Sequence, residues 1–288
     1  MLELEKNCKI IKEKDLDDAE TRKFAIKSLE TIFTKVGCEV FNMERFDRLM
    51  NMVFYVMDDY TTDRRGDIGS IVRETAMYTM FNILRTLCKT ESPEVIQKYL
   101  PANRIELIIG ALLQQLVEKI DKMRLIAGHI LQKIFDDCYE QLPEFSEKEN
   151  LHKIFSNKAI RERVEIDLSR IYDKFDISLI DTSFLEYSDN ENLVYFWNVP
   201  YCVFRTITPL ITSSTYSPSI CRGIALSAGG ITETTMSHSV KNLTAVLESL
   251  SEDTQENLLI KSRILDTYIK ILGKFAKMEK FLTPLFNT

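Results

Sequence analysis

A segment that recurs at a fixed interval constrains this chain more than any other feature. An arginine followed three residues later by an alanine occurs at Arg22, Arg73 and Arg124, which lie 51 residues apart in both steps. Internal repeats of about 20–50 residues are typical of solenoids, in which each helical unit buries its apolar face against its neighbours. The interval therefore predicts stacked helical units.

The residues after each alanine follow a helical period. Apolar side chains stand four, seven and eight positions further on: Leu29, Ile32 and Phe33; Met80, Ile83 and Leu84; Leu131, Ile134 and Phe135. Such spacing makes one stripe on a helix of 3.6 residues per turn. We expect Ala25, Ala76 and Ala127 at equivalent buried positions, where a small side chain lets a neighbouring helix approach. The alternative is that any helical protein yields similar stripes.

The three repeated arginines are expected to be structural. A partly buried arginine can cover its methylenes and present its guanidinium to a carboxylate of a connecting segment. We therefore interpret Arg22, Arg73 and Arg124 as a structural ladder, in which Arg73 and Arg124 each pair with an acidic residue of their own or the adjoining unit. Residues 66–73 resemble the element that opens the second helix of a HEAT unit, whose usual length is about 40–47 residues.

The repeat also suggests a domain organisation. We expect HEAT-like helical repeats over residues 1–140, an insertion or loop region over 141–200, and a C-terminal helical block over 201–288. Residues 173–192 are rich in Asp, Ser, Thr and Asn, which favours a loop, and Ser146 is expected to open a capping box. The predicted fold class is all-α, a HEAT/armadillo-like α-solenoid of antiparallel helix pairs.

Charge and hydropathy exclude several classes of protein. The net charge is −6 and no basic stripe is visible, whereas a nucleic-acid binder normally carries one. No run of about 18 apolar residues predicts a membrane span, and the charged N-terminus lacks the apolar core of a signal peptide. The six cysteines are scattered, which predicts free thiols in a reducing compartment. We expect a cytoplasmic location.

Residues typical of catalysis are sparse. The three histidines are far apart, and no spacing predicts a zinc site or a phosphate-binding glycine loop. The adjacent acids Asp58 and Asp59, like Asp136 and Asp137, are interpreted as solvated residues at helix ends. The sequence therefore predicts a non-catalytic binding protein without a cofactor, and an enzyme assembled from distant residues is the alternative.

Two polar connections are candidates for partner binding. They cover residues 58–67 and 229–239, and polar connections on one edge of a solenoid often bind partners. The alternative is a solvated connection with capping residues, for which Asp67 is the natural cap. The candidate partner-binding residues are Asp63, Arg64, Arg65, Asp67, Glu233, Thr234 and His238.

The same connections carry a family resemblance. Residues 59–74 closely resemble the D-Y-T-T-D-x-R-G-D-V-G-x-x-V-R-E stretch of the tubulin-folding cofactor D family. Residues 118–124 resemble its E-K-I-D-x-x-R, and residues 230–239 are similar to its G-L-T-E-S-T-x-x-H-S. Family members are several times longer, so the resemblance concerns their C-terminal portion.

The resemblance implies a solenoid that binds β-tubulin. With cofactors E and C and an Arf-like small GTPase, such a protein assembles or takes apart the αβ-tubulin heterodimer, and the complex stimulates GTP hydrolysis by tubulin. A cytoskeleton-associated location follows. The alternative is a generic HEAT-repeat scaffold or adaptor, which periodicity alone does not distinguish.

Overall fold

The computed structural model describes residues 2–9, 18–163, 196–228 and 233–275. Within these ranges the chain is almost entirely helical, and its strands are the two-residue β1 (Thr62–Asp63) and β2 (Gly66–Asp67). The all-α, solenoid-like fold class is thereby confirmed. The loop expected at residues 173–192 lies outside the described residues.

The chain divides into two compact units. Unit 1 comprises Met1–Ala111 and Lys133–Ser146, and unit 2 comprises Leu112–Gln132 and Glu147–Thr288. Two helices, α6 (Ala102–Leu116) and α7 (Asp121–Asp137), contribute residues to both units.

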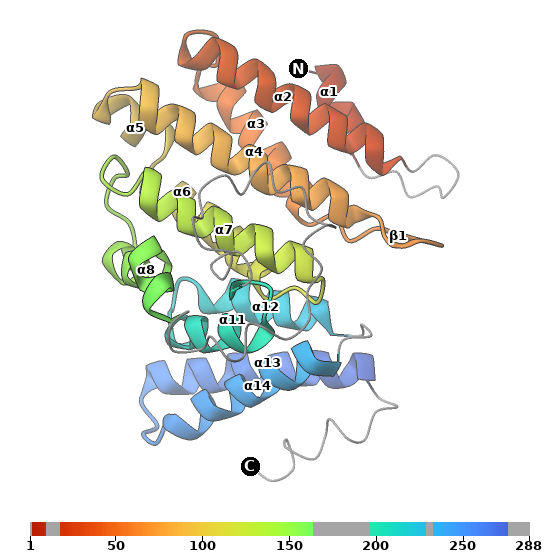
Figure 1. Cartoon of the computed structure of the whole chain (residues 1–288), viewed down its shortest axis with the longest axis vertical. Helices are drawn as coiled ribbons and strands as arrows, with labels where there is room; N and C mark the ends of the chain where they lie inside the picture. Colours follow the sequence, from red (N-terminus) through yellow and green to blue (C-terminus); the bar gives the residue numbers. More distant parts are fainter. Residues whose placement is uncertain (1, 10–17, 164–195, 229–232, 276–288) are drawn as a thin grey trace. The chain divides into compact units, whose positions relative to one another are not determined.

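Unit 1 is built on long helices that pack lengthwise. Its further helices are α1 (Leu2–Asn7), α2 (Ala19–Val40), α3 (Met43–Met57), α4 (Gly69–Thr90) and α5 (Pro93–Tyr99). α2 lies along α4, and α3 also packs on α4, to which the β1–β2 hairpin joins it (Figure 1). The buried face of α3 is Phe46, Leu49, Met50, Val53, Val56 and Met57, at the spacing that a helix requires.

A cluster of aromatic residues packs α2, α3 and α5 of unit 1 together. The ring of Phe33 lies 5.3 Å from that of Phe41 and 5.4 Å from that of Phe46, and Phe46 meets Tyr99 edge-on at 5.0 Å. The Tyr99 hydroxyl donates a 2.8 Å hydrogen bond to the carbonyl of Phe41. Each fully buried phenylalanine contributes about 1.5–3 kcal/mol through removal of apolar area from water.

The repeated alanines are buried, as the 51-residue interval predicts. Ala25 on α2, Ala76 on α4 and Ala127 on α7 are 3%, 0% and 0% exposed. Each stands three residues after an arginine that is itself buried, near the start of its helix. The apolar stripe of a helix and its opening polar network are therefore built from one short sequence element.

Unit 2 contains both short and long helices. They are α8 (Lys148–Phe155), α11 (Pro200–Ile207), the 3₁₀ helix η3 (Thr208–Ile211), α12 (Ser217–Ser227), α13 (Glu233–Ser249) and α14 (Gln255–Phe275). Residues 157–163 are also helical. α11 packs against α13, and α12 against α14 (Figure 1). No helix in the described ranges is long and apolar enough to span a bilayer.

The core of unit 2 includes the one tryptophan of the chain. Trp197 is fully buried and stacks on Phe155 at 5.7 Å, while its indole N–H donates to Gln132 at 3.2 Å. Gly128 on α7 lies beneath the indole, because a Cβ at that position would approach two ring atoms to 2.3 Å. A glycine is therefore required where the tryptophan meets the helix backbone.

The capping box expected at Ser146 is wrong. The N-cap of α8 is Glu147, in a left-handed conformation with φ 60°, and it makes no side-chain capping bond. Ser146 instead directs its backbone N–H and its hydroxyl to the carboxylate of Glu106, 40 positions earlier in the chain. The carboxylate of Glu106, which is distant in sequence, therefore takes the place of the local acceptor that a capping box would supply.

Candidate partner-binding site at the hairpin between α3 and α4

A buried carboxylate organises the connection between α3 and α4. Asp59 is 0% exposed, and its Oδ2 accepts a 2.8 Å hydrogen bond from Nε of Arg22. Its Oδ1 accepts from the backbone N–H and the hydroxyl of Thr61, at 3.1 and 2.7 Å. Arg22 also donates to the Thr61 hydroxyl at 3.0 Å. The expectation that Asp58 and Asp59 are both solvated is wrong for Asp59, because the arginine of α2 pairs with it in the interior.

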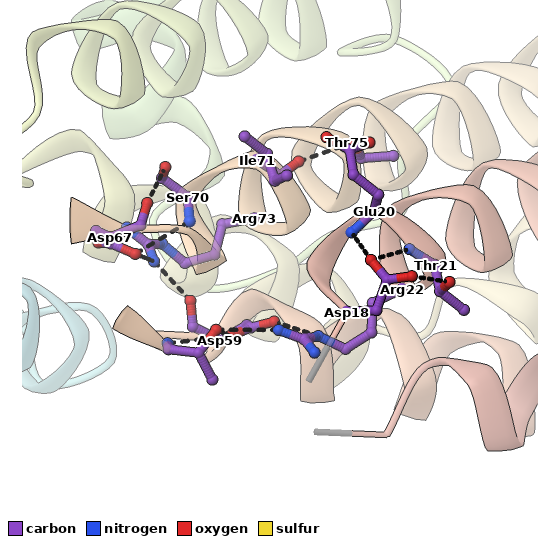
Figure 2. A network of polar contacts seen from close by, with 11 residues as sticks. Asp18, Glu20, Thr21, Arg22, Asp59, Asp67, Ser70, Ile71, Arg73 and Thr75 are labelled. Carbon is purple, nitrogen blue, oxygen red and sulfur yellow. Dashed lines mark hydrogen bonds and ion pairs between the residues drawn. The ribbon is translucent and has the colours of Figure 1, made fainter. Parts of the chain in front are cut away.

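Arg73 holds the same connection from the side of α4. Its Nη1 donates to the carbonyl oxygen of Asp59 at 2.6 Å, and its two terminal nitrogens donate to the carboxylate of Asp67 at 3.2 and 3.0 Å. The guanidinium carbon lies 4.0 Å from the ring centroid of Tyr60. Figure 2 shows Arg22, Asp59, Arg73 and Asp67 in one continuous polar network.

The start of α4 is fitted tightly to this network. Oδ1 of Asp67 accepts from the backbone N–H of Ser70 at 3.1 Å, which satisfies one of the donors that a helix leaves open at its first turn. Gly69 lies so close to Asp59 that a Cβ would come within 2.1 Å of its carbonyl oxygen. We call residues 59–61, 67 and 69 with Arg22 and Arg73 the buried joint.

A short hairpin extends from the buried joint. Thr62 pairs with Asp67 and Asp63 with Gly66, so Arg64 and Arg65 form the turn. Gly66 has φ 110°, a conformation that side-chain-bearing residues rarely adopt. Residues 62–66 are all exposed. The sequence predicts a polar connection here, and the structure gives it a defined backbone.

Within the turn, Asp63 and Arg65 are joined by hydrogen bonds and an ion pair. Asp63 accepts the backbone N–H of Arg65 at 2.7 Å and its Nε at 2.8 Å. The hydrogen bond from the Arg65 side chain is the main cause that lowers the pKa of Asp63, and the same bond raises the pKa of Arg65. Because both groups are solvated, this pair orders the turn and contributes little to global stability.

The candidate residues of this connection therefore differ in their tasks. Asp67 accepts from the first turn of α4 and binds Arg73, whereas Asp63 and Arg65 brace the turn of the hairpin. Arg64 is exposed at the tip, and the described residues include no ion pair with it. A stiff hairpin that presents cationic side chains can bind carboxylates of another protein.

The third repeated arginine, Arg124, lies at the centre of a similar polar network in unit 2. Arg124 donates to the carbonyls of Glu118 at 2.7 Å, Lys119 at 3.0 Å and Asn198 at 3.0 Å, and it forms an ion pair with Asp121. Burial lowers the pKa of the Arg124 guanidinium, and the charge of Asp121 opposes this effect. The ion pairs expected for Arg73 and Arg124 are thus present.

The candidates of the second polar connection lie on α13. Glu233 and Thr234 are the first residues of the helix, and their side chains are outside the described part of the structure. His238 is half-buried, and its ring centroid lies 5.8 Å from that of Tyr201. The hairpin belongs to unit 1, whereas α13 belongs to unit 2.

Sequence reasoning missed Asp59, Thr61 and Gly69 as members of the site. No local signal distinguishes Asp59 from Asp58, but residues 59–74 were already marked by their family resemblance. Among the described residues, no group of three or more His, Cys, Asp or Glu could hold a metal ion.

The C-terminal part of the chain is similar to a known family. Residues 106–288, well over half of the chain, match the family described as "Tubulin folding cofactor D C terminal". The chain is also 26% identical over 125 residues to Tubulin-specific chaperone D of Dictyostelium discoideum, and this match covers 39% of the chain and 8% of that relative. The chain thus covers only a small part of the relative's length, and the hairpin precedes the residues that match the family.

Proposed function

The chain belongs to the tubulin-folding cofactor D family, and from this we propose that it binds β-tubulin as a chaperone segment. It acts in assembly and disassembly of the αβ-tubulin heterodimer, together with cofactors E and C and an Arf-like small GTPase. Its location is the cytoplasm, in association with the cytoskeleton. The helices are HEAT-like repeats over residues 1–140, followed by an insertion over 141–200 and a C-terminal block over 201–288.

The observation that carries the site proposal is the contrast between the buried joint and the hairpin tip. Arg22, Asp59 and Arg73 are almost completely buried, and they fix the base from which the exposed turn projects. A loop positioned by a rigid base loses little conformational entropy when it binds. The tip therefore meets an acidic partner surface with its arginines already in place, and tubulin is an acidic protein.

The two arginines at the tip differ in whether their charge is already paired with a carboxylate. Arg65 is engaged by Asp63, and the charge of Glu20 also raises its pKa. Arg64 is therefore the stronger candidate for a direct contact with a carboxylate of the partner. Arg65 acts mainly by holding the turn.

Stimulation of GTP hydrolysis is a property of the whole complex in this proposal. The chain supplies a binding surface, and the catalytic groups belong to tubulin and the partner proteins. GTP turnover by tubulin should therefore rise when the chain is added with cofactors C and E, and should not rise with the chain alone. Stimulation by the chain alone would contradict this division of roles.

The binding experiment compares single substitutions at the tip. Association of the purified chain with αβ-tubulin is measured by biolayer interferometry for the wild type, Arg64→Ala, Arg65→Ala and the double variant. Because exposed arginines act chiefly through steering, the double variant should associate about tenfold more slowly. Arg64→Ala should account for most of this loss, and the melting temperature should stay unchanged.

Arg45→Ala provides a matched control, since it removes one exposed arginine from α3 of the same unit. It should associate at the wild-type rate. Failure of the wild-type chain to bind tubulin would contradict the proposed function itself. Wild-type binding that survives the double change would remove the tip from the interface while leaving the function standing.

A further inference from the structure

Helix α14 packs on unit 2 with one face and exposes an apolar stripe on another. Its buried face consists of Ile260, Ile264, Thr267, Tyr268 and Ile271. This face packs on α12 and α13, and the hydroxyl of Tyr268 lies 2.7 Å from that of Thr244 on α13. The neighbouring helices therefore fix which side of α14 faces the solvent (Figure 1).

The exposed stripe follows steps of four and three residues along α14. Its large apolar side chains Leu258, Leu265 and Ile269 are 49%, 49% and 66% exposed. Ser262 is exposed between the two leucines, and half-buried Leu272 follows the isoleucine. We call these five residues the α14 seam. A single exposed apolar residue is ordinary, but apolar residues that continue along one side of a helix are typical of a contact surface.

The spacing of the α14 seam is that of a two-stranded coiled coil. Steps of four, three, four and three place Leu258, Leu265 and Leu272 at d positions of a heptad, and Ser262 and Ile269 at a positions. Leucine at d with a β-branched residue at a favours a parallel pair of helices. The small side chain of Ser262 lets a second helix approach closely near the middle of the seam.

The charges beside the α14 seam are complementary to those of a second copy. In a parallel pair, a g residue of one helix lies beside the e residue five positions later on the other helix. Lys261 is at g and Asp266 is at e, so each Lys261 lies beside Asp266 of the other copy, twice by symmetry. Lys261 also contacts Asp253 at 2.6 Å, but that aspartate is 76% exposed, so this solvated pair holds the lysine only weakly.

We propose that the α14 seam is a self-association surface, on which α14 of a second copy of the chain docks in parallel. Removal of the leucines and the isoleucine from water in both copies drives the association. Because the seam covers only about two heptads, the dimer is weak, with a dissociation constant on the order of 10–100 µM. The inference concerns unit 2 and depends neither on the hairpin nor on tubulin as a partner.

Sedimentation equilibrium of the full chain, at concentrations below and above this dissociation constant, tests the inference. The wild type should change from monomer to dimer as its concentration rises. Leu265→Ser should weaken dimerisation about tenfold or more, because it removes a d side chain from both copies. Leu107→Ser is the matched control, since it removes a leucine of α6 that is 58% exposed, and it should dimerise as the wild type does.

Exchange of the flanking charges tests the parallel arrangement. Lys261→Asp brings two acidic side chains together on each side of the dimer and should weaken it about threefold. The double variant Lys261→Asp, Asp266→Lys restores the opposite charges and should dimerise as the wild type does. In an antiparallel pair, e residues lie beside e residues and g beside g, so the second change would not compensate for the first.

Folding of the variants is checked under conditions in which the wild type is monomeric. The melting temperature of Leu265→Ser should stay close to that of the wild type, because Leu265 lies at the surface of the monomer. The inference is overturned if the wild type stays monomeric at every concentration, if Leu265→Ser dimerises equally well, or if the double charge exchange fails to restore dimerisation.

Discussion

The Nε of Arg22 lies 2.8 Å from Oδ2 of Asp59, and the two side chains are 2% and 0% exposed. Desolvation of two charges offsets much of their attraction, so such a pair contributes less to net stability than its geometry suggests. Loss of one partner is different, because the remaining charge stays buried without compensation. The pair therefore specifies how α2 meets the connection after α3 more than it adds stability.

Replacement of Arg22 should be strongly destabilising. Arg22→Ala leaves the Asp59 carboxylate buried without its cationic partner, and we expect a loss of about 3–5 kcal/mol in the free energy of unfolding. Urea denaturation followed by circular dichroism measures the change. Lys23→Ala is the control, because the Lys23–Glu20 pair is solvated and its loss should cost about 0.5 kcal/mol or less. Equal effects of the two substitutions would show that the pair is not sealed from water.

The close approach of Gly69 to Asp59 gives a second prediction. Gly69→Ala places a Cβ against a backbone carbonyl that Arg73 also binds, so the start of α4 must shift, at a cost of about 1–3 kcal/mol. Gly273→Ala on α14 is the matched control, since nothing lies within 4 Å of its Cβ. It should be neutral or stabilise by about 0.5–1 kcal/mol, because alanine favours the helix. Thermal unfolding of both variants decides the matter, and a stable Gly69→Ala variant would refute the close fit.

The contact of Gly128 with Trp197 can be followed by fluorescence. Gly128→Ala pushes a Cβ into the indole, which is packed between Phe155 and Phe196 and has little room to move. We expect a loss of about 1–3 kcal/mol and a red shift of the tryptophan emission. Because the chain has one tryptophan, the signal reports on this site alone. Gly273→Ala should leave the emission unchanged, and an unshifted spectrum of Gly128→Ala would contradict the packing.

The N-cap of α2 gives a pH-dependent prediction. The carboxylate of Asp18 accepts from the backbone N–H groups of Glu20 and Thr21 at 3.0 and 3.2 Å, and the hydrogen bond from the Thr21 side chain is the main cause that lowers its pKa below 3.8. A lowered pKa means that the stabilisation is present above pH 3.8 and is lost as the pH falls through the folded-state value.

Asp18→Ala should therefore cost about 1 kcal/mol at neutral pH. The difference from the wild type should shrink as the pH drops below 3.8, because protonation weakens the cap in the wild type as well. Urea denaturation at several pH values measures both curves. A difference that stays constant to the lowest pH would show that the carboxylate charge has no part in capping.

Features that depend on local periodicity could be predicted from the amino-acid sequence. The alanines at positions 25, 76 and 127 are buried on helices, as the repeat interval predicts. These features are readable because a helix repeats every 3.6 residues, so that one short stretch of sequence specifies which side chains share a face. The pairing of Arg73 and Arg124 with acidic residues was also predictable from their place in the repeat.

Which polar residues are buried depends on contacts between distant parts of the chain, which the sequence does not reveal. Asp58 and Asp59 are alike in sequence, yet Asp58 is exposed and Asp59 is buried, because Arg22 reaches it from 37 positions away. Ser146 likewise donates to Glu106, 40 positions away in the sequence, and does not cap the helix that follows it. Hydrogen bonds between distant residues leave no period in the sequence. The free-energy cost of desolvating a charged side chain is offset only where folding brings a hydrogen-bonding partner within about 3 Å of it.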